Sequence, residues 1–178
     1  MSEQAFFGGG CFWCLEAVFD QVRGVNLAEP GYMGGHIPEP TYEQICTGTT
    51  GHAEIVRITF TPEIIGFETL LRIFFSIHDP TTLDRQGNDI GPQYRSIVFH
   101  QDVTQRELTK NTIDEVGTAG IFRDPIVTEA VPAEHFYPAE NYHKDYFVNN
   151  PNQPYCQIII NPKMEKFRSE WVNFLKTS

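Results

Sequence analysis

Hydrophobic and polar positions along the chain predict short strands alternating with helices. The apolar run Ala5–Phe7 predicts a strand, and it is stopped by three consecutive glycines at positions 8–10. Immediately after the glycines, residues 11–22 carry apolar side chains at helical spacing: Phe12, Leu15, Phe19 and Val22. This order predicts a strand, a tight glycine turn and a helix that begins at Cys11.

The rest of the chain shows the same alternation. Residues 53–60 alternate as a strand, and residues 64–77 carry one helical face of Phe67, Leu70, Leu71 and Phe74. Further strands are predicted at 96–99, 126–131 and 155–160, further helices at 102–116 and 139–149, and a polar loop at 79–94. Asn161 and Pro162 indicate the start of a last helix, which buries Met164, Phe167, Trp171, Phe174 and Leu175. The pattern predicts an α+β fold with a mixed sheet.

Composition narrows the possible partners. The chain has 178 residues and a formal net charge of −10, with no run of Lys or Arg. We therefore expect one domain over residues 1–178, and no binding to nucleic acid or to anionic membranes. No apolar stretch reaches 18 residues, and the N-terminus lacks a signal-peptide pattern. Four cysteines are too few for a disulfide scaffold, so we expect the protein to function in the reducing cytoplasm. We also expect it to be a monomer.

Cys11 is the strongest candidate for a reactive group. At the start of a helix its sulfur lies near unpaired N–H groups and the positive end of the helix dipole, which favour a thiolate. Three other interpretations remain open for this segment. Cys11 is a packed hydrophobe, Cys11 and Cys14 form a thioredoxin-like pair, or they bind zinc; no second Cys-x-x-Cys supports zinc.

Glu54 is the candidate acid. Strand alternation places it on the same face as Val56, Ile58 and Phe60. Burial among apolar side chains raises a carboxyl pKa, and a protonated carboxylic acid near neutral pH is a general acid. The alternative is a carboxylate that reaches solvent at the strand end, beside Gly51 and His52.

Aromatic and polar side chains complete the candidate site. Trp13 lies off the apolar face of the first helix, where a large ring suits the wall of a pocket for a methyl group, whereas Phe12 fits core packing as well. The hydroxyls of Tyr42 and Tyr94 can donate to a developing oxyanion, although a lone tyrosine is normally explained by packing. Asp89 can accept from substrate N–H groups or cap its own turn.

The chain resembles peptide methionine sulfoxide reductase A over nearly its full length. The resemblance is carried by GCFWCLEAVF (10–19), GYMGG (31–35), PTYEQICTGTTGHAEIVRITF (40–60), IHDPTTLDRQGNDIGPQYRSIVF (77–99) and FYPAENYHKDYF (136–147). It implies a two-layer α/β roll, ferredoxin-like, around a mixed central sheet. It also implies reduction of the S epimer of methionine sulfoxide, without metal or organic cofactor, and with thioredoxin as the external reductant.

The resemblance also implies a role for each candidate. Cys11 is the nucleophile and Glu54 the acid that protonates the sulfoxide oxygen. Tyr42 and Tyr94 hold the sulfoxide oxygen through their hydroxyls, and Phe12 and Trp13 surround the substrate's methyl group. Asp89 orients the substrate. After attack, Cys11 becomes a sulfenic acid that a second thiol converts to a disulfide.

Cys14 and Asn141 depart from the family pattern, which has Gly and Asp there in many members. Cys156 is the expected resolving thiol, because prolines and amides before it predict a mobile loop and because it resembles the family's C-terminal recycling cysteine. Cys14 and Cys46 are the alternatives. Rival functions are a general thiol–disulfide oxidoreductase, a non-catalytic sulfoxide-binding module, and a cysteine hydrolase with one of His52, His78 or His143.

Overall fold

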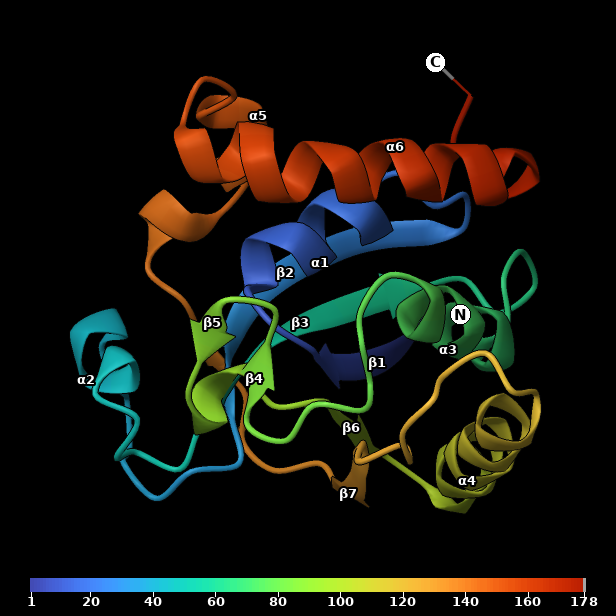
Figure 1. The fold of residues 1–178 in the computed structure, drawn as a ribbon, viewed down its shortest axis with the longest axis horizontal. Coiled ribbons are helices and arrows are strands. Elements are labelled where there is room, and N and C mark those ends of the chain that lie inside the picture. Colours follow the sequence, from blue (N-terminus) through green and yellow to red (C-terminus); the bar gives the residue numbers. More distant parts are fainter. Residues whose placement is uncertain (178) are drawn as a thin grey trace.

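The computed structural model describes residues 1–177 and is built on one six-stranded mixed sheet (Figure 1). Its strand order is β7-β6-β1-β3-β2-β8, in which only β6 and β7 run parallel. The six strands are β1 (Glu3–Gly8), β2 (Val25–Met33), β3 (Ala53–Phe60), β6 (Ile97–His100), β7 (Glu129–Pro132) and β8 (Tyr137–Pro138). The mixed sheet and the α+β class are confirmed.

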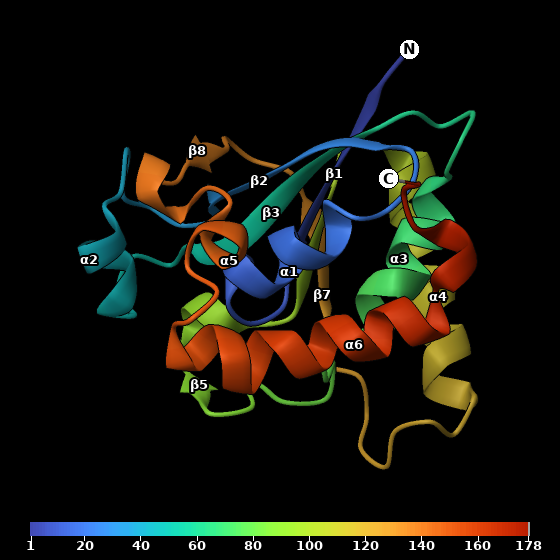
Figure 2. The same cartoon turned by 90° about the horizontal axis from the view of Figure 1, so that it is seen from above.

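Helices cover one face of this sheet. They are α1 (Phe12–Phe19), α2 (Tyr42–Cys46), α3 (Phe67–Ser76), α4 (Val103–Thr118), α5 (Tyr146–Asn149) and α6 (Asn161–Glu170). Figures 1 and 2 show α1 between the sheet and α6, so that α1 has a neighbour on both sides. This explains why all residues of α1 except Trp13 are buried, which exceeds the single apolar face that the sequence predicts.

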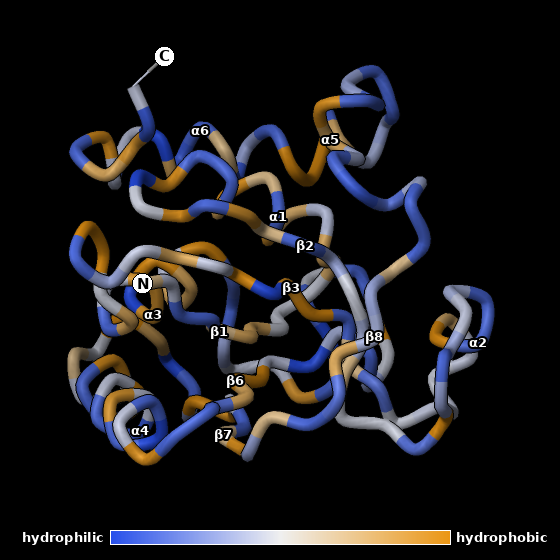
Figure 3. The backbone as a smooth tube through the Cα atoms, turned by 180° about the vertical axis from the view of Figure 1, so that it is seen from behind, coloured by the Kyte–Doolittle hydropathy of each residue, from blue (hydrophilic) through white to orange (hydrophobic). Residues whose placement is uncertain are grey.

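Two apolar clusters lie on opposite faces of the sheet. The larger one joins β1 and β3 to α1, α3 and α6, and it includes Val56, Ile58 and Phe60. The smaller one contains Ala53 and Ile55 from the other face of β3. Figure 3 shows hydrophilic and hydrophobic residues intermixed along α4 and α6, as expected for helices with one covered side and one in solvent.

Most predicted elements are present close to their predicted positions. Asp102 caps α4 by accepting from the backbone N–H of Gln105 (2.8 Å), as its position predicts. The polar loop 79–94 contains a small hairpin of β4 (Arg85–Gln86) and β5 (Asp89–Ile90), followed by a 3₁₀ turn at Pro92–Tyr94. Strand β2 and the short helix α2 have no counterpart in the pattern-based prediction.

The strand predicted at 155–160 is wrong. These residues form a π-helical turn, Cys156–Ile160, that runs directly into α6, so Asn161 is not a helix cap. Cys156, Ile160 and Met164 are buried, whereas Ile158 is exposed, and this four-residue spacing is that of a helix. Pro162 lacks an N–H, and the wider π turn before it accommodates the missing hydrogen bond.

Within residues 1–177, no helix is long and apolar enough to cross a membrane.

Candidate active site

The turn between β1 and α1 places Cys11 at the centre of the candidate site. Cys11 is the N-cap residue of α1, with extended backbone angles, as the glycine pattern predicts. A Cβ on Gly9 would lie 2.8 Å from the His78 ring, and Gly10 has a φ of 90°. The Gly10 N–H donates to the carbonyl of Tyr94 (3.2 Å), which fixes the 3₁₀ turn beside the nucleophile. The glycines are therefore required by the close packing of this turn.

Glu54 projects from β3 toward the same point. It is 1% exposed, and its Oε1 accepts from the backbone N–H of Phe12 (3.2 Å). Among the described residues, its Oε2 has no hydrogen-bond partner. Burial raises the pKa of Glu54 to about 8, against the opposing effect of the Phe12 N–H. The predicted raised pKa is confirmed, and at neutral pH this side chain carries a proton.

The expected thiolate at Cys11 is wrong for the substrate-free protein. Cys11 is 8% exposed, and burial raises the pKa of its thiol, with the charge of Glu54 as the next cause. The backbone N–H of Trp13 at the helix start lowers this pKa, but it does not outweigh burial. The sequence argument counted the helix dipole and left out the desolvation that comes with a covered turn. The resting site therefore holds a neutral thiol beside a neutral acid.

Tyr42 and Tyr94 bring two hydroxyl groups to this acid. Burial raises the pKa of both, and for both the charge of Glu54 is the second cause. Tyr42 is held by Glu140, whose Oε2 accepts from the Tyr42 N–H (2.8 Å) while its Oε1 accepts from the Tyr32 hydroxyl (3.0 Å). Both hydroxyls remain protonated near neutral pH and are available as neutral donors.

Asp89 approaches the site from the hairpin β4–β5. Its Oδ2 accepts from the hydroxyl of Tyr155 (2.6 Å), and its charge contributes to the raised pKa of Cys11 and of Glu54. The ring of Tyr155 meets that of Trp13 edge-on, with centroids 5.9 Å apart. Asp89 is therefore near the reacting groups, and the residue before Cys156 is hydrogen-bonded to it.

Phe12 and Trp13 form an aromatic wall next to Cys11. Phe12 is fully buried and stacks with Tyr42, with centroids 6.4 Å apart. The indole of Trp13 lies flat on the ring of Tyr146, with centroids 3.7 Å apart and 5° between the ring planes. Its Nε1 donates to Nδ1 of His143 (3.0 Å). The wall is thus held in one orientation by the segment 143–146.

The other three cysteines differ in how far they are buried. Cys14 and Cys156 are buried and close enough that a charge on Cys156 raises the pKa of Cys14, which burial already brings to about 11. The predicted exposure and mobility of Cys156 are wrong, because its side chain is 0% exposed in the π turn. Cys46 is exposed and lies beside Tyr42 on α2. Within residues 1–177 all four cysteines are free.

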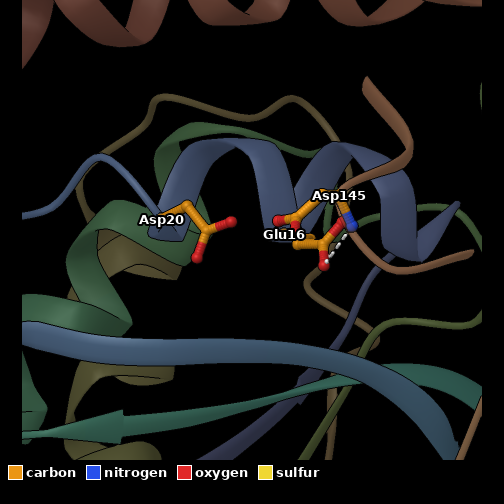
Figure 4. A group of neighbouring side chains, drawn as sticks. All are labelled: Glu16, Asp20 and Asp145. Atoms are coloured by element: carbon orange, nitrogen blue, oxygen red, sulfur yellow. Dashed lines mark hydrogen bonds between the residues drawn. The ribbon is translucent and has the colours of Figure 1, made fainter. Parts of the chain in front are cut away.

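Three carboxyl groups, one from α1 and one from its C-cap residue, point toward one another in Figure 4. Oxygen atoms of Glu16, Asp20 and Asp145 lie within 4.8 Å of one another, and Oε2 of Glu16 accepts from the backbone N–H of Asp145 (3.0 Å). Burial raises the pKa of Glu16 to about 8 and that of Asp20 to about 6. Glu16 is therefore protonated at neutral pH and anchors the start of α5, from which Tyr146 contacts Trp13.

The structure adds supporting residues that the pattern did not single out: Tyr32, Glu140, His143, Tyr146 and Tyr155. His143 had entered only as one of three partners for a hydrolase, yet its bonded neighbour is Trp13. A signal was present in the aromatic residues that surround His143 between residues 136 and 147. His78 donates from Nδ1 to the Phe74 carbonyl, and its Nε2 is hydrogen-bonded to the Ser96 hydroxyl. His52 accepts from the Gly35 N–H at Nδ1 and donates from Nε2 to the Ile37 carbonyl. Neither of these two is bonded to Cys11.

Comparison with known proteins gives a consistent result. The family model for peptide methionine sulfoxide reductase matches residues 3–175. The peptide methionine sulfoxide reductase MsrA of Chromobacterium violaceum is 48% identical over 174 residues, which cover 98% of this chain and 99% of the relative. The MsrA of Saccharolobus solfataricus is 53% identical over 165 residues, covering 93% of this chain and 92% of the relative.

Solved structures show the same fold. Methionine sulfoxide reductase A of Corynebacterium diphtheriae superposes with a TM-score of 0.74 at 36% identity, covering 84% of this chain and 76% of that one. Reduced Mxr1 from Saccharomyces cerevisiae gives a TM-score of 0.80 at 30% identity, covering 87% and 89%. These matches agree with the site described above, in which Cys11 is the N-cap residue of α1 and Glu54 is a buried acid. The chain belongs to the peptide methionine sulfoxide reductase family, and it is an oxidoreductase.

Proposed function

We propose that this protein reduces the S epimer of methionine sulfoxide, free or within proteins, to methionine, and so repairs oxidised proteins. The observation that carries this proposal is the pairing of Cys11 with Glu54, a buried protonated acid with one unpartnered oxygen. A general thiol–disulfide oxidoreductase has no use for such an acid. A sulfoxide does, because its sulfur becomes electrophilic only when its oxygen is protonated or held by donors.

The oxygen-transfer step uses the proton on Glu54. The sulfoxide oxygen lies against Glu54 and the hydroxyls of Tyr42 and Tyr94, and the sulfur lies against Cys11. The Cys11 thiolate attacks the sulfoxide sulfur while Glu54 delivers its proton to the oxygen. The oxygen passes to Cys11, methionine leaves with its sulfur reduced, and Cys11 becomes a sulfenic acid. The thiolate forms as the proton of the Cys11 thiol passes to the Glu54 carboxylate that the transfer to oxygen leaves, so Glu54 ends the step protonated.

The substrate's methyl group lies against Phe12 and Trp13, and Asp89 orients the substrate by accepting from its N–H group. Asp89 is bonded to Tyr155 in the substrate-free protein, so substrate competes with that hydroxyl. A rigid aromatic wall distinguishes the methyl group from the oxygen by chemistry, because only the oxygen can bond to the acid and the tyrosines. Exchanging the two groups on sulfur, as in the R epimer, places oxygen against the indole.

Assays on separated epimers test this function. With dithiothreitol as reductant, the protein is expected to convert the S-sulfoxide of N-acetylmethionine to the thioether and to leave the R-sulfoxide unreacted. Trp13→Ala is expected to raise KM for the S epimer while leaving alkylation of Cys11 by iodoacetamide largely unchanged. Chromatographic separation of product from substrate gives both results. Equal rates on the two epimers would overturn the stereochemical assignment, and no reduction of either would overturn the function.

We propose that the sulfenic acid is resolved in two steps: a Cys11–Cys14 disulfide forms first, and Cys156 then replaces Cys11 in that disulfide. Cys14 attacks the Cys11 sulfenic sulfur, a Cys11–Cys14 disulfide forms, and the hydroxyl leaves as water. The Cys156 thiolate then attacks the Cys14 sulfur, and Cys11 leaves as a free thiol. The burial of Cys11, Cys14 and Cys156 in one packed cluster supports the relay.

Peptide mapping tests the relay. After one equivalent of sulfoxide without reductant, the wild-type protein is expected to contain a Cys14–Cys156 disulfide. Cys156→Ser is expected to release one methionine per chain, to stop at a Cys11–Cys14 disulfide, and to fail to turn over with thioredoxin. Cys46→Ser is the matched control and should behave as wild type. Normal turnover of Cys156→Ser would show that Cys14 alone resolves, and a Cys11–Cys156 bond in a fully active Cys14→Ser would remove Cys14 from the pathway.

Thioredoxin is the proposed external reductant, and it recycles the disulfide by thiol exchange. One structural match is titled as yeast Mxr1 in complex with Trx2, at 21% identity and a TM-score of 0.56. Thiols supply both electrons, so the proposed reaction requires neither a metal nor an organic cofactor. We further propose that residues 1–178 act as one monomeric unit in the cytoplasm, where a thioredoxin system keeps the four cysteines reduced.

A further inference from the structure

His78 closes the back of the glycine turn that precedes the nucleophile. The residue is 7% exposed, and two of its ring carbons lie 2.8 and 3.2 Å from the place that a Cβ on Gly9 would take. The ring of Phe74 stacks on the imidazole with centroids 4.1 Å apart, and one of its carbons lies 3.0 Å from the same place. The backbone of the turn therefore packs directly against the imidazole, two residues before Cys11.

Both nitrogens of this imidazole are held by hydrogen bonds. Nδ1 lies 2.6 Å from the carbonyl oxygen of Phe74, which can only accept, so Nδ1 carries the hydrogen. Burial lowers the pKa of His78 to about 4, so the ring is neutral and Nε2 is an acceptor. The Ser96 hydroxyl therefore donates to Nε2 (2.8 Å) and accepts from the hydroxyl of Thr128 (2.7 Å). This chain of bonds ties the end of α3 to the residues that precede β6 and β7.

The segment that receives this chain also carries one of the proposed catalytic hydroxyls. Ser96 lies two residues after Tyr94, whose backbone carbonyl accepts from the Gly10 N–H (3.2 Å). The turn before Cys11 is thus held at two consecutive glycines, by the imidazole and by the backbone of Tyr94. Because His78 is bonded to the segment that provides the second contact, it links the position of the Cys11 sulfur to that of the Tyr94 side chain.

We propose that His78 is a positioning residue for the nucleophile, which holds the glycine turn against the segment 94–96 and so fixes Cys11 relative to the groups that bind the sulfoxide oxygen. This inference rests on the proposed sulfoxide reductase function. Attack on sulfur requires aligned atoms about 3–3.5 Å apart, and a misplacement of about 1 Å costs about 10²-fold in rate. His78 acts on the turn and not on the substrate, so its loss is expected in the rate of the chemical step and not in substrate affinity.

Three variants separate the hydrogen bonds of His78 from the bulk of its ring. His78→Phe keeps a flat ring beside Gly9 and loses both bonds, whereas His78→Gln places an amide oxygen near the position of Nε2 and keeps an acceptor for Ser96. Ser96→Ala removes the same bond from the other partner with a smaller change in the core. Ile73→Val, at a fully buried position of α3, is the control for a core that is only less stable.

Single-turnover reduction of N-acetylmethionine S-sulfoxide, measured over a range of substrate concentrations, separates rate from affinity. His78→Phe is expected to lower the maximal rate about 10- to 100-fold and to leave the half-saturating concentration nearly unchanged. Ser96→Ala should show a smaller loss of the same kind, and His78→Gln should recover most of the rate. Ile73→Val should lower the Tm and keep the wild-type rate. Wild-type rates in both His78→Phe and Ser96→Ala, or losses confined to the half-saturating concentration, would overturn the assignment.

Amide hydrogen exchange at Gly10 gives a second result that requires no activity. In ¹⁵N-labelled His78→Phe, the Gly10 N–H is expected to exchange about 10-fold faster than in wild type, relative to the amides of β1, because the contact behind the turn has lost its two bonds. In Ile73→Val the amides of Gly10 and β1 should change together. A Gly10 amide as protected in His78→Phe as in wild type would overturn the inference. The expected exchange result in a wild-type protein that reduces no sulfoxide would instead overturn the proposed function.

Discussion

Cys11→Ser is expected to abolish sulfoxide reduction completely. A serine hydroxyl at this helix cap is nearly isosteric with the thiol but is a far weaker nucleophile. The measurement is the yield of methionine per chain in a single turnover without external reductant, which should fall from one to zero. Thermal unfolding should change little, because serine also suits the N-cap of a helix.

Cys46→Ser is the control for the loss of a thiol as such. Cys46 is exposed on α2, and its replacement should leave the single-turnover yield at one methionine per chain. Reduction by Cys11→Ser at the wild-type rate would remove Cys11 from the reaction and with it the proposed chemistry.

Glu54→Gln is expected to slow the single-turnover reduction by roughly 10²–10⁴-fold, the usual contribution of a general acid. The amide keeps the shape and can still accept from the Phe12 N–H, but it cannot readily transfer a proton. In the wild-type protein the acid is protonated below its pKa of about 8. The rate is therefore expected to fall as pH rises through this value, and the Gln variant should lack that decline. A wild-type profile that is flat from pH 5 to 9, with an unaffected Gln variant, would contradict the assignment.

The stability of Glu54→Gln separates a lost acid from a damaged fold. Burial raises the native pKa of Glu54 above its ordinary value, so the native state binds this proton more tightly than the unfolded chain does. Wild-type stability therefore decreases as pH rises from about 4.5 through about 8. The amide has no proton to lose, and the variant should be as stable as wild type at pH 5 and more stable at pH 9. A variant that is less stable throughout would attribute the slow rate to misfolding.

The sequence was most informative where one local rule decides the structure. Alternation along 53–60 placed Glu54 on the apolar face of β3, and its side chain is buried there in the structure. The glycines before Cys11 predicted a turn into a helix, and the packing of Gly9 against His78 shows why larger residues do not fit. The strand alternation and the glycine turn are each predicted from consecutive residues, so a single sequence suffices to predict them.

The sequence failed where the answer depends on distant segments. The thiol of Cys11 was expected to ionise readily, but burial in the folded protein raises its pKa, and the charge of Glu54, 43 positions further along the chain, raises it further. Cys156 was placed in a mobile loop because of Pro151 and Pro154, yet the helix that follows packs it against α1. The clamp on Trp13 is built from His143 and Tyr146, about 130 residues away. The spacing of residues along the sequence does not predict contacts between segments that are this far apart in the chain.

Trapping the oxidised nucleophile tests the central claim most directly. A Cys14→Ser/Cys156→Ser variant keeps Cys11 and Glu54 but removes both proposed resolving thiols. Mixed with one equivalent of methionine S-sulfoxide and dimedone, it is expected to release one methionine per chain and to carry one dimedone adduct on Cys11, the mark of a sulfenic acid, by peptide mass spectrometry. Methionine release with Cys11 unmodified, or an adduct on Cys46 instead, would contradict the transfer of oxygen from sulfoxide to Cys11.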